Sequence, residues 1–559
     1  MTRSIITPVS RRTTIAGLAG ATALGVAPSL TLAQQAGTDG LFRHGIASGD
    51  PDDTSVVLWT RVSDAGETEV EWELSERADF ASMAGQGRAV ASAERDFTVK
   101  VVASGLVPGK TYHYRFRSKG TLSRIGRTRT LPRGRLDRLG IALASCSNYA
   151  FGHFNAYDAI ARDRAVDFVL HTGDYIYEYG ADGWGADIAR KLGRVHQPAN
   201  EIVTLADYRQ RHAQYKTDAG SQAMLAAHPL LACWDDHESA NNPWTGGAEN
   251  HQSDREGSWA DRRAASIRAY FEWMPVREPG DGDRSRFWRG YSFGSLATLH
   301  TLETRHTGRA LQIDYRDWSP RIKTQADADR LLREELGAPG RAMLARELEA
   351  DLNAALRRSV KERQPWRLIG NPMPIARTPV PDVVKLGIIP DPEQLKDAAN
   401  EAKVLAWKGK WNLPFYPDTW DGYPWARERL YDLSREAGAG DLIFLTGDSH
   451  SFWANRLADA KGRPAGIEIG TAGITSPGDF IESGFAPKVA RQLDRAFADH
   501  CPEILWTDNM HQGYVRIDLT PDSGRATFLA VDTVQSPDYR MGILKRMPFR
   551  RRNGSVDFA

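Results

Sequence analysis

The stretch DFVLHTGDYIYEYG, residues 167–180, joins an apolar run to a polar loop. The run is typical of a buried strand, and the loop opens with Gly173 and Asp174 and carries Tyr177 three residues later. A glycine here lets the backbone approach other groups closely, so Asp174 can emerge at the edge of a sheet. One aspartate and one tyrosine prove nothing alone, and the rest of the chain decides whether they belong to a site.

Four other apolar runs have the same form, because each ends in polar or charged residues on its C-terminal side. From residue 138 onward these runs alternate with helical stretches, and runs that are apolar on both faces are typical of buried strands. We therefore expect an α/β fold with a layered β-sheet core flanked by helices. In open α/β sheets, ligands bind beside the carboxyl ends of the strands. The runs are IALASCS, PLLACWDDHE, WRLIGNP and DLIFLTGDSH.

The chain before residue 138 shows short strand-like runs separated by Gly, Pro, Asp and Ser. The run TYHYRFRS alternates between apolar and polar residues, as half-buried antiparallel strands do. We predict a fibronectin type III-like β-sandwich at residues 38–135, followed by a larger α/β domain at residues 138–545. The segment TLPRGRLDRLG is expected to link the two domains.

The first 33 residues look like a targeting segment. Arg11 and Arg12 precede an Ala/Gly-rich stretch without acidic residues, which resembles a twin-arginine export signal. The match is imperfect because Thr14 stands where such signals commonly carry a bulky apolar residue. We expect the twin-arginine (Tat) export machinery to be a partner, and the protein to be periplasmic or secreted without a stable membrane span. An uncleaved N-terminal membrane anchor is the alternative.

Composition narrows the classes of protein. The 559 residues are 41% hydrophobic, which is enough for a large core and favours two domains. The net charge of +1 gives no basic excess that would indicate nucleic-acid binding. Only three cysteines, Cys146, Cys233 and Cys501, are present, so the chain is not a disulfide scaffold.

The residues that follow the apolar runs form a candidate metal cluster. They include a thiol, a phenol, several carboxylates and imidazoles. Carboxylates that converge at one sheet edge repel one another unless a multivalent cation holds them together. Each residue alone has an ordinary role as a core, turn or capping residue, so the shared location carries the argument. The candidates are Cys146, Asp174, Tyr177, Asp235, Asp236, His237, Asp448 and His450.

Three short motifs resemble those of a known superfamily. GDYIY is similar to the Gly-Asp-x-x-Tyr element of calcineurin-like metallophosphoesterases of the purple acid phosphatase kind. DDHE and GDSH stand where that superfamily has Gly-Asn-His-Glu or Asp, and Gly-His-x-His. The fuller forms SCS, HTGDYIYEYG, WDDHESANN and TGDSHSFWAN, behind a sandwich and an export signal, resemble the PhoD alkaline phosphatase family. The resemblance implies a metallophosphoesterase-type fold and covers nearly the whole chain.

The resemblance also implies a set of ligands for two or more metals. Asp174 would bridge two ions, with Cys146, Tyr177 and His450 completing the first site. Asp236 and Asp448 would serve the second site, with Asn241 or Asn242 as a further candidate. Asp235 either binds another calcium or orients its neighbour.

The family is expected to hold Fe³⁺ with one or two Ca²⁺ ions. The chemistry of the donors agrees, because phenolate and thiolate suit iron whereas carboxylate and amide oxygens suit calcium. The broader superfamily has a further metal-binding His before its last motif, but RLIGNPMPIA contains none. Asn371 in this stretch could supply an oxygen instead.

Such a centre predicts hydrolysis of phosphate esters. Two close cations lower the pKa of a water, and the resulting hydroxide can attack phosphorus in line with the leaving group. His237 is the candidate donor to the phosphate or the leaving oxygen. Arg305 and Arg309 are candidates for gripping the phosphate in a bidentate way, although surface arginines beside a strand are as common.

The leading hypothesis is an exported, metal-dependent phosphoesterase that scavenges phosphate from monoesters, diesters or both. Its substrates would be small-molecule, lipid or polymer phosphate esters. A phospholipase D-like phosphodiesterase of the same fold is the alternative. Two other classes remain open, a calcium-stabilised protein without enzymatic activity and a hydrolase that uses the thiol of Cys146.

Overall fold

The computed structural model describes residues 40–63, 66–394, 399–552 and 554–559. The predicted export signal at residues 1–33 and the start of the predicted sandwich lie outside these ranges. Among the described residues, no helix is both long enough and apolar enough to cross a membrane.

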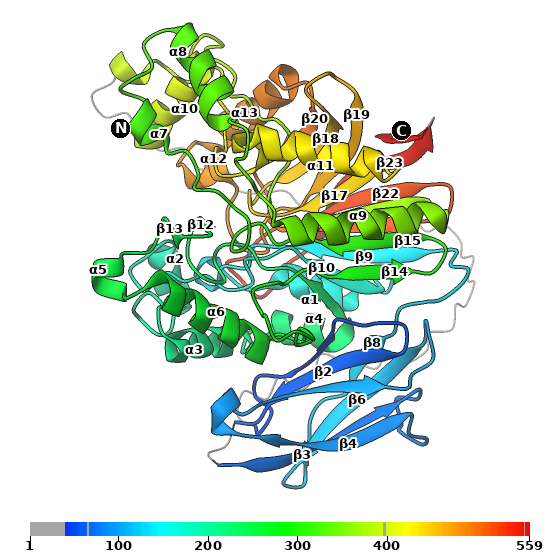
Figure 1. Ribbon diagram of the computed structural model, residues 1–559. Coiled ribbons are helices and arrows are strands. Elements are labelled where there is room, and N and C mark those ends of the chain that lie inside the picture. The colour runs from blue at the N-terminus through cyan, green and yellow to red at the C-terminus, as the bar shows by residue number, and fades with distance from the viewer. Residues whose placement is uncertain (1–39, 64–65, 395–398, 553) are drawn as a thin grey trace, which may run out of the picture. The chain divides into compact units, whose positions relative to one another are not determined.

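Two large sheets form the core of the α/β part, as predicted (Figure 1). One sheet has ten strands in the order β24-β23-β22-β21-β9-β10-β11-β1-β2-β5, and the other has seven in the order β14-β15-β16-β17-β19-β18-β20. Apolar side chains from both sheets make one buried cluster, so the sheets pack face to face. This arrangement confirms the predicted layered α/β fold.

Each sheet contains a run of parallel strands, and three strands of each run lead into the loops of the candidate site. Their apolar residues are fully buried because both faces of each strand are covered. In the first sheet these strands are β9 (Leu139–Ala144), β10 (Phe168–His171) and β11 (Leu230–Ala232). In the second sheet they are β15 (Ala297–Thr301), β16 (Trp366–Asn371) and β17 (Leu442–Thr446).

The remaining strands extend the two sheets, mostly by antiparallel pairing. The first sheet continues through β21 (Gly513–Leu519), β22 (Gly524–Val531), β23 (Met541–Arg552) and β24 (Ser555–Phe558). The second sheet also contains β14 (Gly290–Phe293), β18 (Phe452–Ala458), β19 (Pro464–Gly470) and β20 (Ile504–Asp508).

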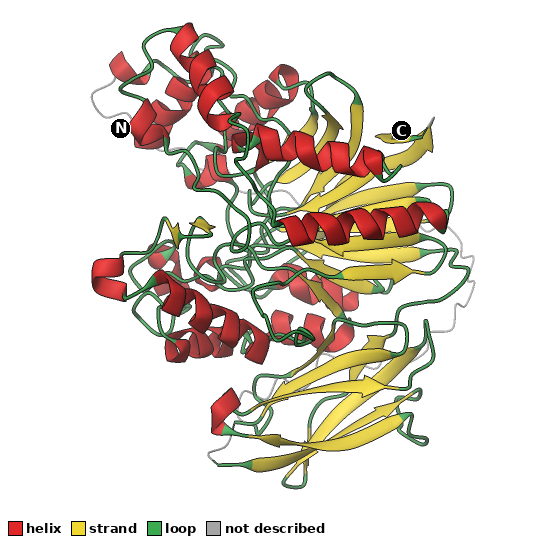
Figure 2. Cartoon of the chain, in the orientation of Figure 1, coloured by secondary structure: helices red, strands yellow, loops and turns green. Residues whose placement is uncertain are grey.

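Helices cover the outer faces of both sheets (Figure 2). Apolar residues of four helices pack with the first sheet in one buried cluster. Two further helices pack against the second sheet in another cluster. The first group is α1 (Asn155–Arg162), α3 (Leu205–Tyr215), α4 (Ala219–Ala227) and α6 (Trp259–Trp273), and the second is α9 (Arg346–Lys361) and α11 (Pro424–Glu436).

The N-terminal strands also form two sheets with an apolar cluster between them. One of them is continuous with the large sheet, because β1 (Ile46–Gly49) pairs in parallel with β11. The predicted division into two domains at residues 135–138 stays a prediction. The large sheet continues through β2 (Ser55–Arg61) and β5 (Thr98–Ser104), and the second sheet holds β3 (Thr68–Ser75), β4 (Gly85–Ala91), β6 (Thr111–Ser118), β7 (Thr121–Leu122) and β8 (Gly126–Arg129).

Candidate metal centre

The candidate ligands come from the loops that follow parallel strands of both sheets. Cys146 follows β9, Asp174 follows β10, and Asp235 and Asp236 follow β11. From the opposite sheet, the loop after β17 supplies Asp448 and His450. All of these side chains are buried, except that Asp448 is partly exposed.

A first group of donors forms around Asp174. Ligand atoms of Cys146, Asp174 and His450 all lie within 4.8 Å of one another. The Cys146 thiol donates a hydrogen bond to Asp174 Oδ2 at 3.3 Å, and the Tyr177 hydroxyl lies 3.3 Å from the same oxygen. Tyr177 also lies 3.3 Å from His450 Nε2. The structure therefore brings together the four residues expected at the first metal site.

These ligands depend on an unusual backbone conformation at the strand ends. Cys146, Asp174, Asp448 and His450 all have φ between 53° and 65°. This left-handed region costs a residue with a side chain on the order of 1 kcal/mol or more, so the surrounding fold must impose it. Strained residues of this kind often cluster at functional sites.

Gly173 is required for a related reason. Its φ is 103°, and a Cβ there would lie 2.4 Å from both Cβ and N of Asp235. The close approach expected at this glycine is thus made to the neighbouring strand end of β11. It lets the loops after β10 and β11 run side by side.

A second group of carboxylates surrounds Arg305. Ligand atoms of Asp235, Asp236 and Asp448 lie within 4.8 Å of one another. Arg305 Nε donates to Asp235 Oδ1 at 2.5 Å, and its Nη2 donates to Asp448 Oδ1 at 3.1 Å. Arg305 follows β15 and is fully buried, so its charge partly neutralises this group.

The charges in the cluster are not fully balanced. Burial raises the pKa of Asp174 well above its usual value, and the charges of Asp236 and Asp235 add to this effect. Burial and the charge of Asp235 likewise raise the pKa of Asp448. Asp235 Oδ2, Asp236 Oδ1 and His450 Nδ1 find no hydrogen-bond partner among the described residues. Unpaired buried groups of this kind fit bound cations, so the residues present suit a metal centre.

His237 sits between the two groups. Its Nδ1 lies 2.7 Å from Glu178 Oε2, and its ring stacks on Tyr177 with centroids 4.2 Å apart. Burial lowers the pKa of His237, but Asp236, Glu178 and Asp174 raise it more, so the pKa lies well above its usual value. The imidazole is therefore held in an orientation and charge state that suit a proton donor.

Glu178 is a site residue that sequence reasoning missed. Its Oε1 accepts hydrogen bonds from the Asn241 amide at 2.8 Å and from Asn250 Nδ2 at 2.9 Å. The only signal in the sequence was its position directly after Tyr177. Glu238 has a comparable supporting role, because its carboxylate accepts hydrogen bonds from the backbone amides of Asp174 and Asp235 at 3.0 and 2.8 Å.

The two candidate asparagines have different surroundings. The side-chain oxygen Oδ1 of Asn242 accepts a hydrogen bond from Arg305 Nη1 at 3.4 Å, and the backbone amide of Asn242 donates to Asp236 Oδ2 at 2.9 Å. Asn242 thus borders the second carboxylate group. Asn241 contributes its backbone amide to Glu178.

Two candidates make their contacts elsewhere. Arg309 is buried, and its guanidinium donates to the carbonyl of Asp418 at 2.5 Å and to the sulfur of Met373 at 3.6 Å. Asn371 Oδ1 accepts from Trp420 Nε1 at 3.1 Å. The structure therefore gives Arg309 a packing role and Asn371 a helix-anchoring contact, and neither joins the cluster by a hydrogen bond.

An aromatic side chain that the sequence did not suggest covers the site. The Trp184 ring stacks on His450 with centroids 5.4 Å apart and lies 6.5 Å from the His237 ring. On the same side, Asp479 and Glu482 carry carboxylate oxygens within 4.8 Å of a His450 nitrogen. The Trp184 ring therefore lies beside both imidazoles.

Comparisons with known proteins agree with this site. The family model of PhoD-like phosphatases matches residues 141–528, and the model of their N-terminal domain matches residues 25–132. Alkaline phosphatase D of Bacillus subtilis (strain 168) is 32% identical in an alignment of 521 residues that covers 89% of this chain and 78% of that protein. A solved structure of PhoD is similar with a TM-score of 0.74 and 28% identity, covering 93% of this chain and 92% of that one.

Proposed function

The chain belongs to the PhoD-like phosphatase family and is a metal-dependent hydrolase of phosphoric ester bonds, and we propose that it hydrolyses phosphate monoesters and diesters at the cluster around Asp174. One observation carries the proposal. A thiol, a phenol, an imidazole and a carboxylate from two sheets converge, with ligand atoms of Cys146, Asp174 and His450 within 4.8 Å of one another.

The donor types support iron at the first group and calcium at the second. Cys146, Tyr177 and His450 offer sulfur, phenol and nitrogen ligands, which suit Fe³⁺. Asp236, Asp448 and the Asn242 amide offer oxygens, which suit Ca²⁺. Arg305 already pairs with Asp235 and Asp448, so it competes with a third ion for these carboxylates. We therefore propose one iron with one or two calcium ions.

Metals bound at these residues would supply positive charge that lowers the pKa of water and stabilises the phosphoryl oxygens. The chain supplies the other groups. The Arg305 guanidinium, fixed by Asp235, is placed to bind a phosphoryl oxygen beside the carboxylates. His237 has Nδ1 held by Glu178, so Nε2 is the nitrogen that can donate a proton to the leaving oxygen.

The surroundings of Cys146 do not favour a thiol hydrolase. Burial raises the pKa of the Cys146 thiol well above its usual value, and the charge of Asp174 adds to this effect. The thiol donates to Asp174 at 3.3 Å, whereas the pKa of a nucleophilic thiol is lowered by a nearby positive charge. As a ligand of a bound cation, the same sulfur would lose its proton.

Hydrolysis of bis-p-nitrophenyl phosphate and of p-nitrophenyl phosphate tests the proposed reaction and compares diesters with monoesters. We expect turnover of at least one ester, loss of turnover after chelation, and recovery when metals are restored. A chelated protein that still hydrolyses both esters at full rate would contradict the proposal.

We also propose that the protein is exported through the twin-arginine pathway to scavenge phosphate outside the cytoplasm. The proposal rests on Arg11 and Arg12 and the following Ala/Gly-rich stretch. Replacing both arginines by lysine should retain the protein in the cytoplasm with an uncleaved N-terminus. Export of this double variant at the normal level would argue against the twin-arginine route.

A further inference from the structure

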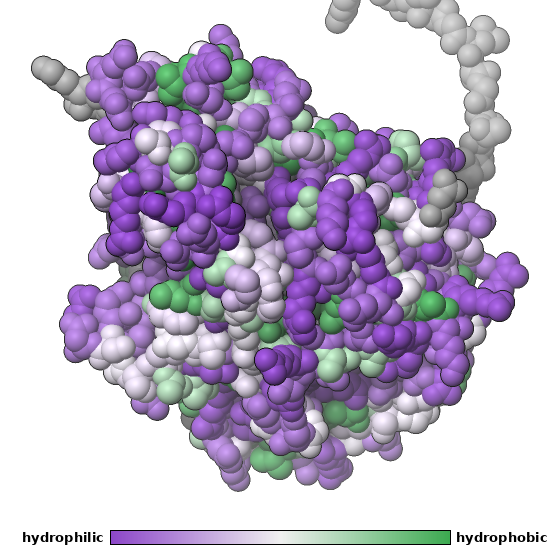
Figure 3. All heavy atoms as spheres, turned by 45° about the horizontal axis from the view of Figure 1, so that its top comes forward, coloured by the Kyte–Doolittle hydropathy of each residue, from purple (hydrophilic) through white to green (hydrophobic). Residues whose placement is uncertain are grey.

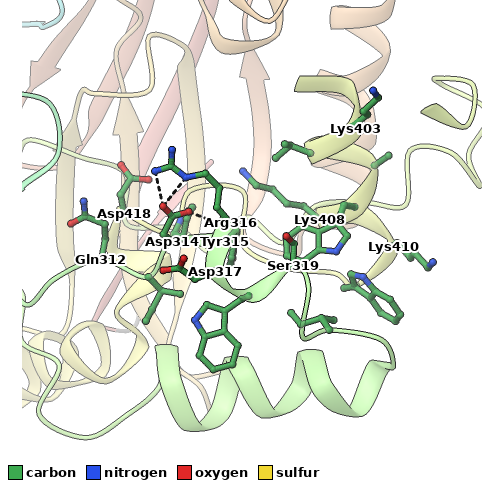
Figure 4. Close-up of a pocket in the computed structure, with 18 of the residues that line it drawn as sticks. Gln312, Asp314, Tyr315, Arg316, Asp317, Ser319, Lys403, Lys408, Lys410 and Asp418 are labelled. Atoms are coloured by element: carbon green, nitrogen blue, oxygen red, sulfur yellow. Dashed lines mark hydrogen bonds and ion pairs between the residues drawn. The ribbon is translucent and has the colours of Figure 1, made fainter. Parts of the chain in front are cut away.

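A cavity of about 1540 Å³ is lined in part by Asn242, which borders the second carboxylate group. Figure 4 shows part of its wall. Its walls include α7 (Tyr315–Trp318), the helix α10 (Asn400–Lys410) and the loop that ends at Asp418. Ligand pockets for small molecules measure about 300–1000 Å³, so this space can hold a larger group than a phosphate.

One lining residue, Asn242, connects the cavity to the cluster. Asn242 lies in the cavity wall and accepts a hydrogen bond from Arg305 at 3.4 Å. Asp418 also lines the cavity, and its carbonyl accepts from Arg309. In Figure 4, Gln312 and Asp418 lie at one side of the cavity, and Lys403 and Lys410 lie on the helix at the other side. A substrate with its phosphate at Arg305 can therefore extend into this space.

Much of the cavity wall is apolar. Trp318, Trp407 and Trp411 line it and are only partly buried, and they pack on a small core that includes Ile322. Two aliphatic lining residues are exposed to an unusual degree, Leu311 at 52% and Val404 at 46%. Figure 3, which brings the top of Figure 1 forward, shows hydrophobic residues exposed among hydrophilic ones on this part of the surface. Apolar side chains gathered in a hollow indicate an apolar ligand.

Several charged groups of the wall already have partners within the protein. Arg316 donates to the carboxylates of Asp314 and Glu249. Lys408 donates to the carbonyl of Phe415 at 2.8 Å and lies 5.6 Å from the centre of the Tyr315 ring. The wall carries lysines and carboxylates together, so it does not present one sign of charge to a ligand.

We propose that this cavity binds an alkyl chain carried by one ester group of a phosphodiester whose phosphate lies at the cluster. The proposal rests on the proposed phosphoesterase function and adds the class of substrate. The size of the cavity, the hydrogen bond between its lining residue Asn242 and Arg305, and its exposed aliphatic residues favour a long flexible chain over a single ring.

A series of alkyl p-nitrophenyl phosphates, from methyl to octyl and below their micelle concentrations, tests the proposal. The leaving group is p-nitrophenol throughout, so only the chain that enters the cavity changes. Burying a methylene is worth about 0.8 kcal/mol, which corresponds to a rise in kcat/KM of up to roughly fourfold per added carbon. We expect kcat/KM to rise by about two- to fourfold per methylene until the chain fills the apolar part of the wall.

Two variants locate the effect. Trp407→Ala and Val404→Asn should flatten the dependence on chain length and leave kcat/KM of the methyl ester within about twofold of the wild type. Val404 is exposed, so its replacement does not endanger folding. Trp425→Ala is the matched control, because Trp425 lies on α11, is partly buried and is outside the cavity wall. It should leave the chain-length dependence unchanged.

Three outcomes would overturn the proposal. The first is hydrolysis of the methyl ester with no gain from longer chains, and the second is an equal flattening in Trp425→Ala. The third is a phenyl ester that surpasses the octyl ester, which would assign the cavity to a planar group. If no ester is hydrolysed, calorimetry with methyl- and octylphosphonate still decides, because tighter binding of octylphosphonate supports the cavity while only the proposed reaction fails.

Discussion

The hydroxyl of Tyr177 lies 3.3 Å from Nε2 of His450, although 273 residues separate them in the chain. Tyr177 follows β10 of the ten-stranded sheet, and His450 follows β17 of the seven-stranded sheet. The contact therefore forms only when the two sheets pack with their carboxyl ends on the same side. It links the layered fold directly to the first group of candidate metal ligands.

Tyr177→Phe tests this contact through a signal that depends on iron. A phenolate bound to Fe³⁺ gives a charge-transfer band in the visible spectrum, so we expect the purified protein to be coloured and the variant to lose or shift the band. Tyr175→Phe is the control, because Tyr175 bonds Ser221 at 2.8 Å and is not a candidate ligand. A colourless, iron-free protein with full activity would remove iron from the account.

Cys146→Ala distinguishes a ligand from a nucleophile. We expect bound metal and turnover to fall together, because the sulfur is proposed to hold an ion. Cys501→Ala is the control, since its buried thiol donates to the carbonyl of Pro379 at 3.2 Å. Loss of activity with an unchanged metal content in Cys146→Ala would instead support a thiol-dependent hydrolase.

The two candidate arginines should respond differently to substitution. Arg305→Lys keeps a charge but loses the planar fork, so we expect KM for bis-p-nitrophenyl phosphate to rise by about tenfold or more. Arg309→Met should lower the free energy of unfolding by about 2–3 kcal/mol with little change in KM, because Arg309 bonds the Asp418 carbonyl. Kinetic assays and chemical denaturation separate these effects. A larger change in KM for Arg309→Met would reverse the two roles.

A buried lysine predicts a pH dependence of stability. Lys216 is fully buried beside Trp59 and Tyr175, and burial lowers its pKa to about 7. The unfolded chain has the higher pKa, so the cost of burying the charge is present below pH 7 and disappears as the pH rises toward the unfolded value. Lys216→Met should therefore stabilise the protein by on the order of a few kcal/mol near pH 6 and by much less near pH 10.

Denaturation of the wild type and Lys216→Met across this pH range measures the effect. Lys100→Met offers a comparison, because burial lowers the pKa of Lys100 only to about 8. A constant difference in stability between wild type and Lys216→Met at all pH values would show that Lys216 is not buried as a charged group.

The sequence predicted the elements that carry the site better than the directions of its side chains. Apolar runs ending in Asp174, Asp236 and Asp448 were sufficient to predict strands whose carboxyl ends meet. The pairing of Glu178 with His237 was not predictable, because both residues lie in loops and the contact depends on local backbone geometry. The left-handed conformation of Asp174 and Cys146 has no signal in the residue type, since neither is glycine.

Contacts between residues that are far apart in the sequence explain the other differences between the prediction and the structure. Arg305 and Arg309 follow the same strand and are four residues apart, yet one bonds Asp235 and the other bonds Asp418. Only the packed structure separates these two environments. The apolar cavity could not be predicted from the sequence either, because its wall combines separate segments of the chain. These are Asn242, α7, α10 and Asp418.

Metal content and turnover of Asp174→Asn, measured on the same preparations as the wild type, test the central claim most directly. Asparagine tolerates the left-handed conformation of Asp174, so the variant removes the charge without adding backbone strain. Asp158→Asn is the control, because Asp158 accepts a hydrogen bond from the Tyr539 hydroxyl at 2.7 Å but lies on α1.

We predict that Asp174→Asn loses bound metal and at least about a hundredfold in kcat/KM for bis-p-nitrophenyl phosphate, whereas Asp158→Asn keeps both. An Asp174→Asn protein that retains the wild-type metal content and turnover would contradict the assignment of Asp174 as the residue that holds the metal centre together.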